Sequence, residues 1–137
     1  MNKKAKRVAL FSALSAKVAA GELIVVDEIK LETYKTSAIA AMLKALGCQK
    51  EVTKNYKVTT VQDGEVIKER KTRTAVVAEK ALVVLPEVNE CVIKSCANLE
   101  GVKTTQWNTV NVYDILNCDT LVVDKAAVAK IEEVYAR

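Results

Sequence analysis

The residues that could carry out acid–base chemistry in this chain are carboxylates and lysines, because its 137 residues include no histidine. Asp27 ends the apolar stretch ELIVVD, and Glu28 follows it. Glu87 follows ALVVLP, and Asp124 ends TLVVD. If these stretches are parallel strands, the carboxylates gather beyond the carboxyl ends of the sheet, where open α/β sheets bind their ligands. Such a cluster could accept a phosphoryl group or transfer a proton.

Each of these acids also has a purely structural interpretation. Asp124 stands directly before a helical pattern, where aspartate caps a first turn, and Asp27 suits the turn after its strand. The acids together with Lys125 are similar to the site of phosphoacceptor receiver domains, but ALVVLPE has no aspartate where the phosphoacceptor would stand. The four glycines are isolated, so no phosphate-binding loop is present. We therefore expect no enzymatic activity and no cofactor.

The four cysteines do not form a recognisable metal site. Cys48, Cys91, Cys96 and Cys118 include no CxxC pair, and no histidine is available to complete a mixed zinc site. We expect buried free thiols and no bound metal.

Positive charge is concentrated at the start of the chain. The stretch NKKAKR places four cations in five positions, and no acid precedes Glu22, although the whole chain has a net charge of only +4. Residues 81–137, by contrast, hold five cations against eight acids. This asymmetry favours a polyanionic partner on one side of the molecule. The candidate contacts of such a partner in this region are Asn2, Lys3, Lys4, Lys6, Arg7 and Lys17.

The elements that position these residues begin with a helix over 3–20. Asn2 suits its N-cap, Gly21 suits its C-terminal stop, and an apolar stripe of Val8, Phe11, Leu14 and Val18 recurs at helical spacing. Cations in a first turn oppose the helix dipole, and an anion supplied from outside would remove that conflict.

Strand and helix patterns then alternate along the chain. Strands are predicted at 22–27, 81–85, 102–107 and 120–124, and helices at 36–47 (capped by Thr36), 87–99, 111–117 and 125–137. Apolar strands separated by helices predict a mainly parallel sheet of about four strands with helices on both faces. We expect one α/β domain over 1–137. No apolar run approaches the ~20 residues that span a bilayer, so we expect no membrane partner.

One segment, 52–76, breaks this alternation. It alternates with period two around Asp63-Gly64, which predicts a β-hairpin of 52–61 with 66–76, inserted into the domain. That register sets Lys57 opposite Arg70 and Lys54 opposite Arg73, and like charges directly opposed destabilise a ladder. Either the register slips, or the side chains splay into water, or a polyanion binds there. The hairpin adds Lys54, Lys57, Arg70, Lys71 and Arg73 to the candidate contacts of a polyanion.

Three segments carry a family resemblance. NKKAKRVALFSALSAKVAAGELIVVDEI, LVVLPEVNECVIKSCANLEGVK and NVYDILNCDTLVVDKAAVAKIEE resemble the C-terminal part of the bacterial large-subunit ribosomal protein L-four family. The resemblance covers nearly all of the chain except about 51–78. It implies an α/β domain bound to large-subunit ribosomal RNA beside neighbouring ribosomal proteins, in the cytoplasm. The family's N-terminal element and tunnel loop lie upstream of the matched part.

Three functions follow as hypotheses. The leading one is a structural constituent of the large ribosomal subunit whose basic side chains contact RNA phosphates. The resemblance also implies a second, a regulatory module that represses its own operon by binding the leader messenger RNA. The third is a carboxylate-using, receiver-like domain.

Overall fold

A four-stranded parallel sheet forms the centre of the computed structural model, which describes residues 2–62 and 65–135. Its strands are β1 (Leu23–Val26), β4 (Ala81–Leu85), β5 (Val102–Gln106) and β6 (Thr120–Asp124). Their spatial order is β1-β6-β4-β5, and all three pairings are parallel. The last strand in the sequence therefore lies inside the sheet, between β1 and β4.

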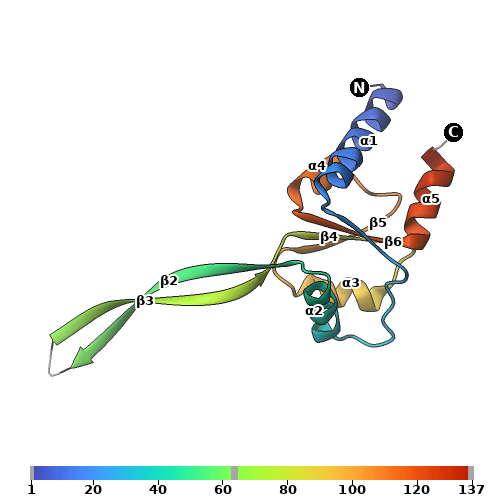
Figure 1. Cartoon of the computed structure of the whole chain (residues 1–137). Helices are drawn as coiled ribbons and strands as arrows, with labels where there is room; N and C mark the ends of the chain where they lie inside the picture. The colour runs from blue at the N-terminus through green and yellow to red at the C-terminus, as the bar shows by residue number, and fades with distance from the viewer. Residues whose placement is uncertain (1, 63–64, 136–137) are drawn as a thin grey trace.

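Helices cover both faces of this sheet (Figure 1). One face carries α1 (Lys3–Ala20), α4 (Val112–Asn117) and α5 (Lys125–Tyr135), and the other carries α2 (Thr36–Ala45) and α3 (Glu90–Ala97). The predicted α/β fold, with about four parallel strands between two helical layers, is confirmed.

The two central strands supply side chains to both helical layers because successive residues of a strand point to opposite faces. On β4, Val83 and Leu85 pack toward α2 and α3, whereas Leu82 and Val84 pack toward α1, α4 and α5. All five residues of β4 are buried. This explains why β4 reads as a continuous apolar run rather than an alternating one.

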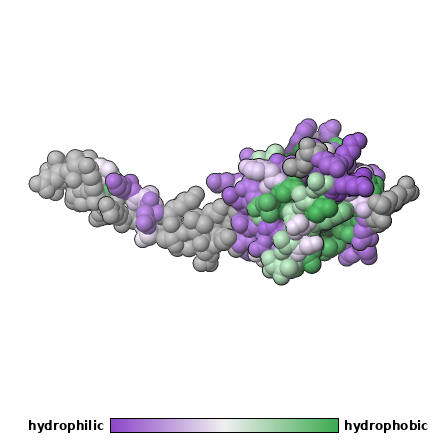
Figure 2. Space-filling model, turned by 90° about the horizontal axis from the view of Figure 1, so that it is seen from above, coloured by the Kyte–Doolittle hydropathy of each residue, from purple (hydrophilic) through white to green (hydrophobic). Residues whose placement is uncertain are grey.

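The buried side of α1 differs from the predicted apolar stripe. Leu10, Ala13 and Lys17 face the core, whereas Val8 is 66% exposed and Val18 is 61% exposed. Phe11 lies at the edge, 38% exposed. The predicted stripe therefore faces outward for most of its length, and the face that carries α1, α4 and α5 shows hydrophobic surface bordered by hydrophilic surface (Figure 2).

Most of the predicted helix ends are correct to within a few residues. Gly21 ends α1 in the left-handed region, at φ 71°, as its position predicts. Asp124 precedes α5, and its Oδ1 accepts a hydrogen bond from the Ala126 amide at 2.8 Å. The prediction for Thr36 is wrong, because Lys35 occupies the N-cap and Thr36 lies inside the helix. Asn2 occupies the N-cap of α1 without a capping hydrogen bond from its side chain.

The inserted hairpin is longer than predicted. It pairs β2 (Gln49–Gln62) with β3 (Glu65–Ala78) in antiparallel fashion. The predicted register is correct, with Lys57 opposite Arg70 and Lys54 opposite Arg73, while the turn at Asp63-Gly64 lies outside the described residues. Fourteen-residue strands reach roughly 45 Å at about 3.3 Å per residue. The hairpin extends away from the sheet and its helices (Figure 1).

Candidate nucleic-acid interface

The first residues of α1 form an exposed cationic surface. We call this surface the basic end of α1 and define it as Asn2, Lys3, Lys4, Lys6 and Arg7, all of which are exposed. The first turn of α1 contains no acid. Among the residues that the structure describes, the three lysines form no ion pair. Their charges are thus available to an external anion.

Contacts between α1 and α5 support this basic end. The guanidinium carbon of Arg7 lies 5.9 Å from the centroid of the Tyr135 ring, a cation–π distance. One helical turn later, the Phe11 ring meets Tyr135 edge-to-face at a centroid distance of 5.8 Å. The Arg7 side chain therefore packs against the Tyr135 ring, and this contact helps to fix the direction in which α1 presents its cations.

Lys17 does not belong to this surface. Its side chain is only 11% exposed, and Nζ donates to Glu22 Oε2 at 2.6 Å and to the carbonyl oxygens of Cys118 at 2.7 Å and Asp119 at 3.3 Å. These three acceptors occupy the three protons of the ammonium. The structure therefore places Lys17 in the packing between α1 and the start of β6, where its ammonium has no proton left to donate to a phosphate.

The hairpin cations lie elsewhere on the molecule. Lys57 is exposed, and the register sets it opposite Arg70. The side chains of Lys54, Arg70, Lys71 and Arg73 lie outside the described part of the structure, so only their positions in the ladder are known. In Figure 1 the hairpin and α1 point in different directions from the sheet. One small anion could not contact both regions, whereas a large folded RNA could.

The acids at the carboxyl ends of the strands make local structural contacts. The buried Asp124 accepts a hydrogen bond at Oδ2 from the Ile29 amide at 2.9 Å, in addition to its capping bond. Asp27 lies 4.0 Å from Lys125, with both side chains largely exposed. Glu87 lies 3.1 Å from Lys130. Asp124 thus fastens the 27–29 segment to the start of α5, as expected of a cap.

Three of the four thiols are buried. Burial raises the pKa of Cys96 to about 11, and it also raises the pKa values of Cys48 and Cys118. Cys91 is partly exposed. Within the described residues, no three of the His, Cys, Asp and Glu side chains gather closely enough to hold a metal ion.

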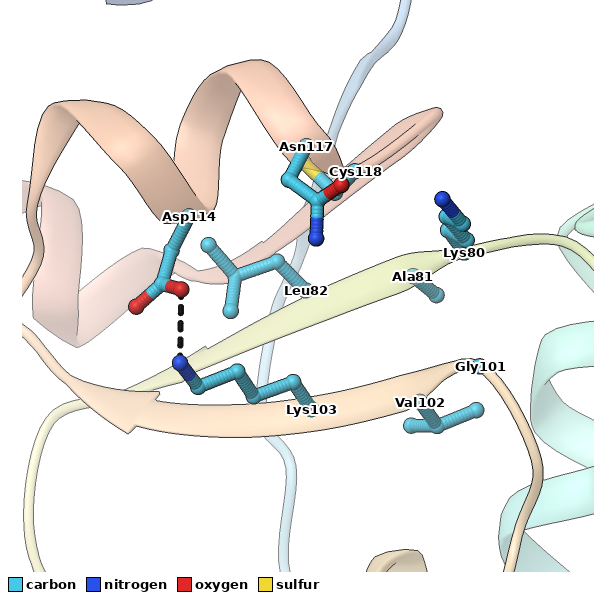
Figure 3. A pocket seen from close by; sticks show the side chains of 9 residues that line it. All are labelled: Lys80, Ala81, Leu82, Gly101, Val102, Lys103, Asp114, Asn117 and Cys118. Atoms are coloured by element: carbon cyan, nitrogen blue, oxygen red, sulfur yellow. Dashed lines mark hydrogen bonds and ion pairs between the residues drawn. The ribbon is translucent and has the colours of Figure 1, made fainter.

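A cavity of about 260 Å³ lies at the amino ends of β4 and β5, beneath α4 (Figure 3). Lys103 on β5 donates to Asp114 Oδ1 at 2.6 Å, and Asn111 Nδ2 donates to Asp114 Oδ2 at 2.9 Å. Asp114 is buried, and these two donors engage both of its carboxylate oxygens. This ion pair could not be predicted from the sequence. A lysine and an aspartate eleven residues apart, on different elements, leave no local sequence pattern.

Among the described residues, no helix is both long and apolar enough to cross a bilayer.

Comparison with known proteins finds relatives that match nearly the whole chain. Residues 1–134 match the model of the ribosomal protein L4/L1 family. The chain is 46% identical over 136 residues to the large ribosomal subunit protein uL4 of Agathobacter rectalis, a match that covers 99% of the chain and 52% of that relative. The uL4 proteins of Alkaliphilus oremlandii and Heliobacterium modesticaldum are 42% and 40% identical, with 51% and 52% of their lengths covered.

The chain thus spans about half the length of the curated relatives it matches. The match nevertheless runs through nearly all of its own residues, and it includes the three segments on which the resemblance was recognised. The chain belongs to the ribosomal protein L4/L1 family.

Proposed function

We propose that this chain is an RNA-binding structural part of the large ribosomal subunit. The ribosomal assignment is supported by family membership, because the matched relatives are named as large-subunit proteins. It extends only to the half of those relatives that the chain spans. Its partners are then large-subunit ribosomal RNA and neighbouring ribosomal proteins, in the cytoplasm.

RNA contact is supported above all by the basic end of α1. Four cations lie within five residues, are exposed, and face no acid in their own first turn. Lysine and arginine contacts of this kind neutralise phosphates and position a protein on RNA without reading its bases. The exposed amide of Asn2 and the first free backbone N–H groups of the helix can donate to phosphate oxygens as well.

The hairpin is a second arm in this proposal. Residues 1–137 act as one α/β domain, and 52–76 are inserted into it as an extension that carries Lys54, Lys57, Arg70, Lys71 and Arg73. A phosphate backbone lying along the hairpin would offset the repulsion of the two like-charged cross-strand pairs.

RNA pull-down from a bacterial extract, followed by sequencing of the retained RNA, tests this function. Large-subunit ribosomal RNA should be enriched over other transcripts of similar abundance. A matched control carries glutamine at Lys3, Lys4, Lys6 and Arg7. Selective enrichment of an operon leader messenger RNA would favour the regulatory function instead, and retention of no RNA by the parent chain would overturn the proposal.

A further inference from the structure

An open pocket of about 630 Å³ lies between the chain segment that enters α2 and helix α3. We call it the Tyr34 pocket; it is lined by Tyr34, Lys35, Thr36, Ser37, Lys94 and Ser95. Its volume falls within the roughly 300–1,000 Å³ typical of small-ligand sites. None of the six residues belongs to the basic end of α1 or to the hairpin.

The walls of this pocket are held together by contacts between distant parts of the sequence. The Lys35 amide donates to Ser95 Oγ at 3.1 Å, across 60 residues, and Ser95 is buried. Nearby, Cys91 Sγ donates to the carbonyl oxygen of Glu32 at 3.7 Å. The segment that carries Tyr34 is therefore fastened to α3 on both sides of the tyrosine, so the pocket exists before any ligand arrives.

The pocket combines an exposed aromatic ring with two cations. Tyr34 is 60% exposed, and Lys94 Nζ lies 5.2 Å from the centroid of its ring. Lys94 also lies 3.8 Å from Glu90 one turn earlier, but both side chains are well exposed, and such pairs are weak. Lys35 forms no ion pair with any residue that the structure describes.

Hydroxyl groups complete the lining. Thr36 and Ser37 are exposed at the start of α2, and each can donate to an anionic oxygen. The pocket thus offers ammonium and hydroxyl donors beside a flat ring, which is a combination suited to a phosphate joined to a planar base.

Resting on the proposed function, we infer that the Tyr34 pocket holds one nucleotide of single-stranded RNA. Its phosphate lies between Lys35 and Lys94, and its base lies against the Tyr34 ring. A base in a duplex is stacked on both sides and cannot reach an aromatic ring on a protein surface, whereas a base in a loop or bulge can. The site therefore adds recognition of an unstacked nucleotide to the backbone contacts of α1.

Titration of a short, labelled, single-stranded RNA at fixed salt concentration tests this inference. Replacement Y34L keeps an apolar side chain but removes the ring, and it should weaken binding roughly tenfold, since stacking of one base on an aromatic side chain is worth about that much. K35Q and K94Q should each weaken binding by about threefold. A duplex of the same sequence should show no effect of Y34L.

Two matched controls come from the same chain. K44Q removes one exposed lysine from the last turn of α2, outside the pocket, and Y113L removes an exposed tyrosine from α4. Both should change affinity for the single strand by less than twofold. Circular dichroism of every variant should match that of the parent, and ultraviolet cross-linking to the single strand should map to the peptide that contains Tyr34.

The outcomes separate this inference from the function on which it rests. If the parent binds RNA and the pocket variants behave like K44Q and Y113L, the pocket assignment is wrong and the proposed function stands. A parent that binds no RNA overturns both. Adenosine monophosphate is the last probe: if it binds the parent as tightly as the RNA strand, and Y34L removes that binding, the pocket is a site for free nucleotides and the RNA assignment is wrong.

Discussion

The Lys17 ammonium lies 2.7 Å from the carbonyl oxygen of Cys118, 101 residues further along the chain. It joins α1 to the residues that lead into β6, and the Glu22 carboxylate, 2.6 Å away, balances its charge. A cation that a charge count assigns to the surface is thus one of the contacts that hold the first helix on the sheet.

Replacing Lys17 by methionine should therefore destabilise the fold. The substitution keeps an unbranched side chain, shorter by the terminal nitrogen, but leaves the Cys118 carbonyl without this donor, at a cost of about 2 kcal/mol. Urea unfolding followed by circular dichroism measures the change. K44M, which alters an exposed lysine, is the control and should change the free energy of unfolding by less than about 0.5 kcal/mol. Equal stabilities of the two variants would contradict a structural role for Lys17.

The basic end of α1 should determine much of the salt dependence of RNA binding. If Lys3, Lys4, Lys6 and Arg7 neutralise about four phosphates, log affinity should fall with log salt with a slope near −3, at roughly 0.7–0.9 per contact. Replacing all four residues by glutamine should flatten that slope, since glutamine keeps nearly the same helix propensity. RNA titrations at several salt concentrations provide the slopes. Identical slopes for the two folded proteins would show that the RNA-binding surface lies elsewhere than the basic end of α1.

Removing 52–76 and joining the ends with a short glycine-containing turn should leave a folded domain. The hairpin extends from the sheet (Figure 1), and among its described side chains 55–57, 59 and 72 are exposed while Val58 is half-buried, so it adds little to the core. We expect cooperative unfolding, with a free energy of unfolding within about 1 kcal/mol of that of the parent, because the entropy of closing a surface loop depends only slowly on its length. A broad, non-cooperative transition would show instead that β2 and β3 are needed for folding.

Alkaline pH should weaken the fold through its buried thiols. Burial raises the pKa of Cys96 from 9.0 to about 11, so above pH 9 the unfolded chain releases this proton while the folded chain keeps it. The contribution of Cys96 to the free energy of unfolding is thus fully present below pH 9 and is lost between pH 9 and 11. Cys48 and Cys118 act in the same direction. Urea unfolding at several pH values measures the decline.

C96A isolates the contribution of Cys96 to that pH dependence. The variant will be less stable at every pH because it leaves a small cavity. Its free energy of unfolding should nevertheless fall less steeply than that of the parent between pH 9 and 11. Parallel curves for C96A and the parent would mean that other groups cause the alkaline loss.

The alternation of strands and helices, the fold class and the hairpin register could all be predicted from the sequence, because each depends on local periodicity and turn residues. The Lys57–Arg70 pairing, for instance, follows from counting outward from Asp63-Gly64. The strand order could not be predicted in this way. It depends on which strands meet across long stretches of chain, and β1 meets β6 rather than β4.

The buried face of α1 could not be predicted for a different reason. Val8 and Val18 are apolar and lie at helical spacing, but the helix packs on Leu10, Ala13 and Lys17. A small alanine allows close approach to the sheet, and a lysine can be buried when three acceptors converge on it. The Tyr34 pocket could not be predicted either, because it depends on a hydrogen bond between the Lys35 amide and Ser95, 60 residues apart.

The position of β6 between β1 and β4 has a consequence for the order of events during protein synthesis. On the four-stranded sheet, β1 receives its hydrogen-bonded neighbour only when residues 120–124 have been made, and Lys17 waits equally long for the Cys118 carbonyl. Contacts of such large sequence separation form late, because a long loop must close first. A growing chain that ends before residue 118 therefore lacks two of the contacts that hold its basic helix on the sheet, the Lys17–Cys118 hydrogen bond and the pairing of β1 with β6. Synthesis of residues 118–135 thus completes the contacts, from Lys17 near one end of α1 to Arg7 near the other, that fix where the cations of this helix point.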